Sequence, residues 1–165
     1  MLHAFTLFHV AISLVAIASG LAVVYGLINN RAYSGATSFF LATTALTSIT
    51  GFVFPFHGIT PGIVLGVLSL IALAIAYWAR SKWVASQRLR KTYLSTMVIA
   101  LYFNVFVLVV QSFEKVPALK ALAPTQKEPP FQIAQLVVLV LFVALGILSV
   151  RRFRGDAARA LSRAA

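Results

Sequence analysis

Polar side chains that could bind a ligand gather in the second half of an otherwise apolar chain. Asn104, Gln111 and Glu114 follow one another at helical spacing within one apolar segment. Gln132 and Gln135 open the next apolar segment. Amide and carboxyl groups inside hydrocarbon are costly unless they meet a polar partner or a polar cavity. We therefore predict that these five residues either join helices by hydrogen bonds or line a ligand pocket.

Two histidines form a second candidate site. His9 lies about one turn inside the first apolar segment, on the face that carries the small residues Ser13 and Gly20. Small residues mark close helix contacts in membranes, so His9 is predicted to face the bundle. His57 follows the second apolar segment and could approach His9. The pair could bind haem iron or, with Glu114, a divalent metal; the alternative is a histidine bonded to a neighbouring backbone or hydroxyl group.

The composition indicates which class of protein must position these residues. Of the 165 residues, 61% are hydrophobic and 10% are charged, and the mean hydropathy is +0.94. Soluble domains carry about a quarter charged residues. The chain is therefore predicted to form one all-α transmembrane helix bundle. It has no cysteine, which excludes thiol chemistry, disulfides and cysteine-bound metals.

Five apolar segments are long enough to cross a bilayer, which takes about 20 residues. The predicted spans are 5–27, 36–55, 59–79, 92–113 and 131–150. Between the last two spans, the sequence VPALKALAP is predicted to form a short amphipathic piece on the outer surface, where it could cover a pocket. The basic tail, 151–165, is predicted to continue as a short surface helix.

The basic residues predict the orientation of these spans. Eleven of them fall at Arg31, in 80–91 and in 151–165, whereas the connections on the opposite side hold only three lysines. Basic residues favour the cytoplasmic side, so five spans with the N-terminus outside and the C-terminus inside are predicted. The net charge of +11 could suggest a nucleic-acid partner. Because the charges lie at the ends of apolar segments, the lipid bilayer is the expected partner instead, with no nucleic acid.

Three stretches of the chain carry a resemblance to known proteins. PFHGITPG, ALYFNVFVLVVQSF and KVPALKALAPTQKEPPF resemble a group of short, uncharacterised, multi-pass bacterial inner-membrane proteins. The similarity covers most of the chain, from the first span to the RRFR tail. It implies a location in the bacterial inner (plasma) membrane. No activity is established for the group, so the resemblance implies no catalytic or binding residue.

These observations favour a small integral membrane protein that binds a haem, metal, quinone-like or lipid-like ligand near the extracytoplasmic leaflet. The expected pocket lies between the fourth and fifth spans, together with His9 and His57. A non-catalytic accessory or oligomer-forming subunit is the alternative, as a homo-oligomer or within a larger membrane complex. A small transporter or channel subunit is a further alternative. Enzymatic activity is not favoured, since no set of catalytic residues is recognisable.

Overall fold

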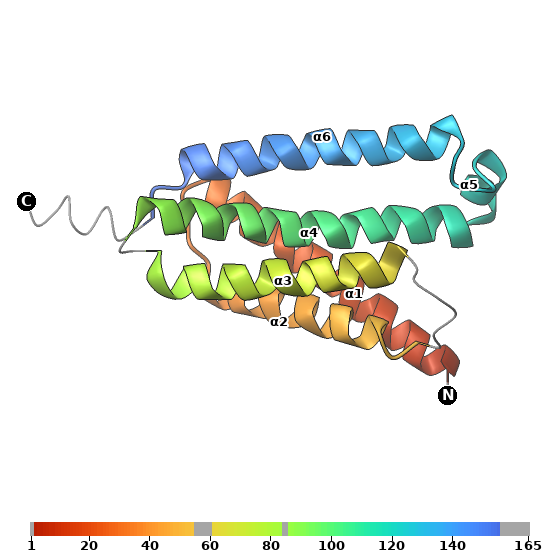
Figure 1. Ribbon diagram of the computed structural model, residues 1–165, viewed down its shortest axis with the longest axis horizontal. Helices are drawn as coiled ribbons and strands as arrows, with labels where there is room; N and C mark the ends of the chain where they lie inside the picture. The colour runs from red at the N-terminus through yellow and green to blue at the C-terminus, as the bar shows by residue number, and fades with distance from the viewer. Residues whose placement is uncertain (1, 55–60, 84–85, 156–165) are drawn as a thin grey trace, which may run out of the picture.

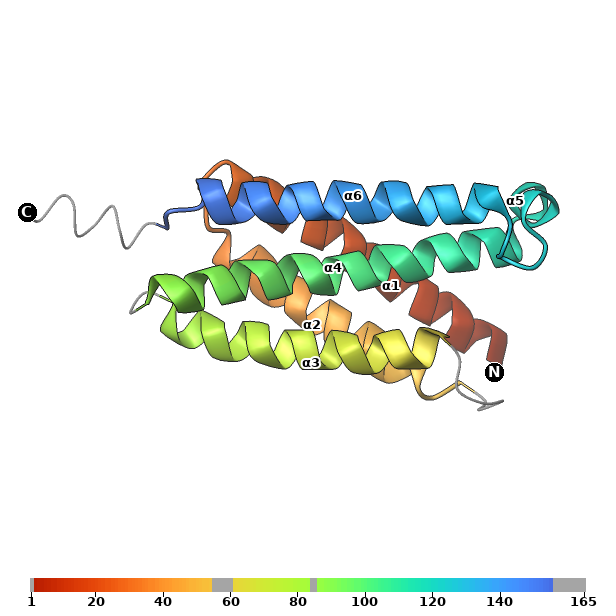
Figure 2. The same ribbon diagram turned by 45° about the horizontal axis from the view of Figure 1, so that its top comes forward.

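The protein is a bundle of helices without strands in the part that the computed structural model describes, residues 2–54, 61–83 and 86–155 (Figure 1). The helices are α1 (Leu2–Ile28), α2 (Ser34–Gly51), α3 (Pro61–Lys82), α4 (Gln87–Lys115), α5 (Pro117–Leu122) and α6 (Pro129–Arg152). Successive long helices run in opposite directions, and α1 crosses behind α3 and α4 at an angle (Figures 1 and 2). The predicted all-α bundle is confirmed, and the short piece before the last long helix is present as α5.

Four of the described helices, α1, α3, α4 and α6, are long and apolar enough to cross a membrane. The second predicted span, α2, is not among the helices that are long and apolar enough to cross a membrane. It has 18 residues and is therefore about 27 Å long, slightly less than the hydrocarbon thickness. Eight of those residues are Ser or Thr, which lowers its hydropathy. The structure thus supports a membrane bundle, while the fifth span stays a prediction.

The outward-facing surface of α6 is consistent with a lipid environment. Only 17% of its most apolar window is buried inside the bundle, and Phe142 and Ser149 are its only buried residues. Large aliphatic side chains such as Ile133 and Val140 are about 60% exposed, at 59% and 61%. A soluble protein rarely exposes a continuous apolar face of this size. Hydrocarbon around the bundle would remove the free-energy cost of exposing these side chains to water.

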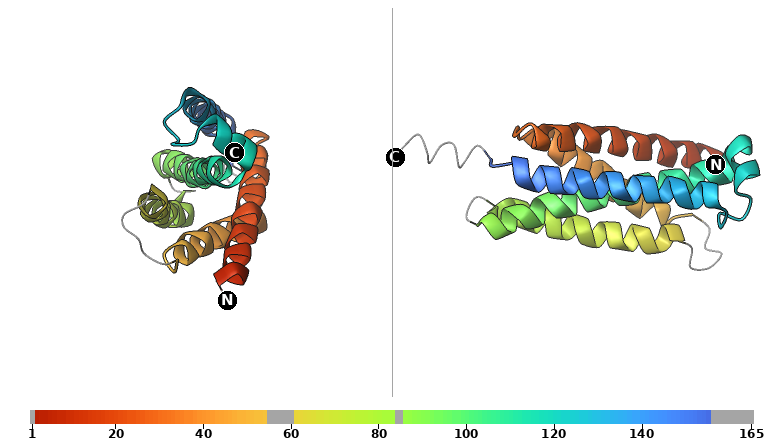
Figure 3. Two further views of the ribbon diagram at one scale, coloured as in Figure 1. Left: turned by 90° about the vertical axis from the view of Figure 1, so that its right-hand side faces the viewer. Right: turned by 90° about the horizontal axis from the view of Figure 1, so that it is seen from above.

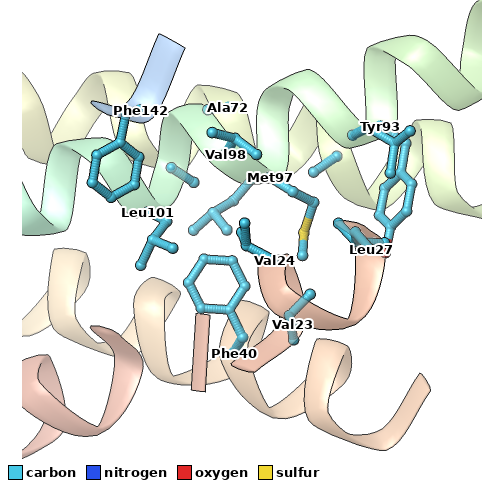
Figure 4. Packing of buried hydrophobic residues seen from close by; sticks show 14 of the residues in the cluster. Val23, Val24, Leu27, Phe40, Ala72, Tyr93, Met97, Val98, Leu101 and Phe142 are labelled. Carbon is cyan, nitrogen blue, oxygen red and sulfur yellow. The ribbon is translucent and has the colours of Figure 1, made fainter. Parts of the chain in front are cut away.

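The core forms where α1 passes closest to α2 and α4. Gly20 lies at this crossing, and a Cβ atom there would be 2.6 Å from Leu101 Cδ1 and 2.7 Å from Phe40 Cε2. The Phe40 ring and Leu101 are both fully buried, and they pack with Val23 of α1 (Figure 4). Small residues allow helices to approach closely in membranes, where the burial of apolar side chains contributes little to the free energy of helix association. The prediction that this face of α1 points into the bundle is confirmed.

At the end that carries most basic residues, the turn after α1 holds the chain that follows α6. Asn30 has a left-handed backbone (φ 55°), and its side-chain Oδ1 accepts hydrogen bonds from Arg154 N at 2.8 Å and Gly155 N at 3.2 Å. Phe153 is only 2% exposed and lies 5.5 Å from the Trp83 ring, measured between centroids. The predicted surface helix is therefore wrong for 153–155, because these residues are tied to the bundle by backbone groups that a helix would use internally. The remainder of the predicted helix, 156–165, lies outside the described residues.

We expect Asn30→Gly to lower the free energy of unfolding by about 1 kcal/mol, since it removes two modest hydrogen bonds but tolerates the left-handed backbone. Asn30→Ala should lower the free energy of unfolding by roughly 1–2 kcal/mol more than Asn30→Gly, because alanine also disfavours the left-handed backbone conformation. Asn30→Asp keeps both the acceptor and the conformation, and is the matched control. Reversible denaturation in detergent micelles measures this order. Equal stabilities for the Gly and Ala variants would contradict it.

Candidate functional site

The amide of Asn104 joins α4 to α2. Its Nδ2 donates a hydrogen bond to Thr44 Oγ1 at 3.2 Å. Thr44 is fully buried, and Asn104 is half-buried. The prediction that Asn104 meets a polar partner on another helix is confirmed. Its role as a ligand-binding residue stays a prediction.

The predicted glutamines at the start of α6 bind backbone carbonyl groups. Gln135 Nε2 donates to Phe106 O of α4 at 3.2 Å, and Gln132 Nε2 donates to Lys127 O at 2.8 Å. Gln111 is exposed and lies five residues further along α4 than the carbonyl that Gln135 uses. The Gln135 Oε1 atom is buried and has no hydrogen-bond partner among the described residues. Gln135 therefore links α6 to α4, and Gln132 links α6 to the segment that precedes it.

The two described carboxylates interact with nearby groups at the chain connections. Glu114 Oε1 lies 2.6 Å from Lys115 Nζ, and both side chains are well exposed; the predicted use of Glu114 as a metal ligand with the histidines stays a prediction. Glu128 accepts hydrogen bonds from Thr125 N, Thr125 Oγ1 and Lys127 N. Partial loss of hydration raises the pKa of Glu128, but these hydrogen bonds outweigh that effect and hold the pKa below its usual value. Both carboxylates stabilise local structure.

His9 joins α1 to the end of α2. Its Nδ1 lies 2.8 Å from Thr50 Oγ1, and its ring meets the Phe54 ring edge-on with centroids 5.2 Å apart. Thr50 Oγ1 donates its single proton to the backbone, at 2.7 Å from Leu46 O. With that proton on the carbonyl, the oxygen can accept a hydrogen bond from the Nδ1–H tautomer of His9. This is the hydroxyl-bonded alternative that the sequence left open.

The predicted metal site depends on His9 and His57 together. His57 lies outside the described residues, so the predicted approach of His57 to His9 stays a prediction. Within 2–54, 61–83 and 86–155, no three His, Cys, Asp or Glu side chains are placed to hold a metal ion. The start of α1, the helix that carries His9, and the start of α6 lie on opposite sides of one end of the bundle (Figures 1 and 3). The predicted pocket that joins His9 to the polar residues of α4 and α6 stays a prediction.

The hollow that α4 and α6 do form lies closer to the basic end. It has a volume of about 310 Å³ and is walled mainly by apolar side chains. Its lining residues are Ser95, Val98, Ile99, Tyr102, Phe103, Leu139, Phe142, Val143 and Gly146, which we call the α4–α6 groove. None of the predicted site residues lines it. It lies between the helices of the fourth and fifth predicted spans, but the predicted pocket at the other end of these helices stays a prediction.

Two hydroxyl groups in the groove have no hydrogen-bond partner within the described residues. Thr92 and Thr96 of the same helix donate their hydroxyls to backbone carbonyls of the preceding turn, at 3.1 Å and 2.9 Å. Ser95 makes no such bond, and Tyr102 contributes only its ring, with its centroid 5.8 Å from that of Phe142. The groove therefore combines an apolar body with two available polar groups, a combination typical of small-ligand sites.

One signal for the groove was present in the sequence. Gly146 is the only glycine of α6, in the middle of an aliphatic stretch. A Cβ atom at that position would have Val98 Cγ1 as its nearest neighbour at 3.7 Å, which is ordinary contact with space beyond it. The missing side chain leaves the hollow, but only the packing of α4 against α6 shows that a neighbouring helix does not fill it.

Comparisons with known proteins add no relative. No protein-family model matches the chain, and neither a curated protein nor a solved structure matches it. The resemblance to short bacterial membrane proteins therefore stays a prediction, and the site is argued from its geometry alone.

The link between α4 and α2 can be measured with a double-mutant cycle. We expect Asn104→Leu and Thr44→Val to be non-additive in the free energy of unfolding by about 0.6 kcal/mol, the average for hydrogen bonds between membrane helices. Thr44→Val keeps the side-chain shape, so its effect isolates the hydroxyl. The measurement is reversible unfolding in mixed micelles, on the two single variants and the double variant. Strict additivity would show that the bond has no energetic weight.

Proposed function

We propose that this chain is a five-span integral membrane protein, with its N-terminus outside, that binds the chain of a lipid-like ligand in the α4–α6 groove. The observation that carries the proposal is the groove itself, an apolar hollow of about 310 Å³ with two unpaired hydroxyls. Ligand clefts of about 300–1,000 Å³ are typical, so a groove of this size suits one apolar chain rather than a whole lipid. The side chains that line it carry no charge, which favours an apolar ligand over a charged solute.

The distribution of charge supports the proposed orientation. Nine described basic residues lie at one end of the bundle: Arg31, Arg80, Lys82, Arg88, Arg90, Lys91, Arg151, Arg152 and Arg154. The opposite end has Lys115, Lys120 and Lys127 together with both described glutamates. By the positive-inside rule, the first end faces the cytoplasm. The resemblance noted in the sequence would make the membrane that of a bacterium.

Hydrogen bonding supports α2 as the fifth span despite its many hydroxyl groups. The side chains of Thr43, Ser48 and Thr50 each donate to a carbonyl four residues earlier, at 2.8 Å, 3.0 Å and 2.7 Å. Such bonds pair the hydroxyl protons inside the helix, so they need no water. Thr44 receives the Asn104 bond. A helix paired in this way can lie in hydrocarbon at modest cost.

The accessory-subunit alternative, in which the polar residues only hold helices together, stays open. The bonds of Asn104 with Thr44 and of His9 with Thr50 lie within one chain, so these pairs require no second subunit. The exposed apolar face of α6 could contact lipid or a partner equally well, and it therefore does not favour either function.

Topology can be tested by introducing single cysteines, because the natural chain has none. We expect Leu122→Cys to react with a membrane-impermeant maleimide added to intact cells. Ala32→Cys and Gln87→Cys should react only after permeabilisation, since five spans place both on the cytoplasmic side. If α2 does not cross, Ala32 and Gln87 fall on opposite sides, and one of them alone would react with intact cells.

Gly146→Leu should reduce binding in the groove by roughly tenfold or more, since a ligand competing with an added side chain pays about 1–3 kcal/mol. The measurement is cross-linking of a phospholipid with a photoactivatable acyl chain to the purified protein, mapped to residues 95–103 and 139–146. Gly146→Ala should bind normally, because its Cβ fits.

The matched control is Ala144→Leu, which adds the same bulk at an exposed position of α6 outside the groove. Folding of each variant is checked by its helical circular dichroism and elution volume. Equal cross-linking in the Gly146→Leu and Ala144→Leu variants would reject the groove as a binding site.

A further inference from the structure

We propose that the α4–α6 groove selects an anionic phospholipid, with Arg88 and Lys91 binding its phosphate while one acyl chain lies in the groove. This inference rests on the function proposed above and names the class of its ligand. The groove by itself would bind the acyl chain of a neutral lipid equally well. The preference for an anion comes from the residues that extend the groove towards the basic end.

The spacing along α4 places both cations in line with the groove. Lys91 lies four residues before Ser95 and Arg88 lies seven before it, so all three share one face of the helix. At the helical rise, Lys91 is about 6 Å and Arg88 about 10 Å beyond Ser95 along the axis. Ser95 lines the groove, and beyond it the same face of α4 carries two positive charges.

Both cations are available for a ligand. Arg88 and Lys91 are exposed, and their side chains have no hydrogen bond or ion pair within the described residues. Other basic side chains of this end are already used: Arg80 donates to Ser38 Oγ at 2.9 Å, and Arg90 donates to Arg154 O at 2.9 Å. Across the described part of the chain, the one ion pair is that of Glu114 with its neighbour, at the other end of the bundle.

The unpaired hydroxyl of Ser95 suits the middle of such a lipid. It lies between the cations and the apolar wall, where the ester groups of a phospholipid would connect phosphate to acyl chains. Its proton can then be donated to an ester carbonyl instead of to the backbone. Burial of a hydroxyl without a partner is unfavourable, so this bond would stabilise the bound lipid.

Charge also decides between a lipid and a second copy of the chain as the occupant. Copies inserted in one membrane share an orientation, so a neighbour seated along this groove would place a second basic end beside the first. No described acidic residue lies there to reduce the repulsion, since Glu114 and Glu128 are at the opposite end. Anionic headgroups attract basic residues at a membrane surface and remove the same repulsion.

The test compares lipids and variants with the purified full-length protein in nanodiscs of phosphatidylcholine. Photoactivatable phosphatidylglycerol and phosphatidylcholine with identical acyl chains are the probes. We expect the anionic probe to label 95–103 and 139–146 at lower concentration than the neutral one. The double variant Arg88→Gln with Lys91→Gln should lose this preference, roughly 30-fold for two basic residues.

The matched control is Arg151→Gln with Arg152→Gln. It removes the same charge from the same end, but these residues lie five and six positions past Gly146, so they point away from the groove face. This control variant should keep most of the preference for the anionic probe. An equal loss in both double variants would show general surface attraction and overturn the proposed phosphate site, as would equal labelling by the two probes with the natural protein.

Two further results separate this inference from the proposed function. If Gly146→Leu blocks both probes while the charge variants change nothing, the groove binds lipid chains without selecting a headgroup, and only the inference fails. If Gly146→Leu leaves labelling unchanged, the proposed function fails as well. Full competition by soluble glycerol phosphate, which has no acyl chain, would reveal a phosphate site independent of the groove and would also overturn the inference.

Discussion

The close approach of α1 to α2 and α4 at Gly20 is the contact on which the bundle depends. Within a bilayer, lipid solvates an apolar helix as well as another helix does, so tight packing must replace the hydrophobic effect. Gly20 provides that packing, because any side chain there would overlap Phe40 and Leu101. The crossing sets the tilt of α1. Its far end then reaches the segment after α6, where Asn30 binds the backbone of Arg154.

Hydrogen-bond satisfaction is the second constraint, and it explains why most polar residues of the chain are structural. Thr43 and Thr50 bond to their own helix, while Asn104 and His9 each bond to a hydroxyl on α2. In hydrocarbon no water is present to take over these bonds, so each pair contributes to the relative placement of helices. Residues that look reactive in sequence are thereby used for packing.

Some hydroxyl groups have no hydrogen-bond partner within the described residues. Thr47, Ser69 and Ser149 are buried in this way, and Ser95 borders the groove, although the neighbouring threonines of α4 bond to the backbone. The hollow is bordered by Gly146, which has no side chain, together with the rings of Tyr102 and Phe142, which contact each other. Its continuation into Arg88 and Lys91 joins an apolar site to the positively charged end of the molecule, the arrangement expected for an amphipathic ligand.

The sequence by itself determined the helical membrane architecture, because hydropathy and the spacing of small residues act locally along each helix. It predicted the inward face of α1 around Gly20 and a polar partner for Asn104 for the same reason. Only the tertiary structure decided which helices those residues meet. In the structure, His9 contacts Thr50, Gln135 binds a backbone carbonyl of α4, and the hollow lies in the basic half of the bundle. These positions depend on helix crossing angles and relative depth, which are set by side-chain packing between segments far apart in sequence.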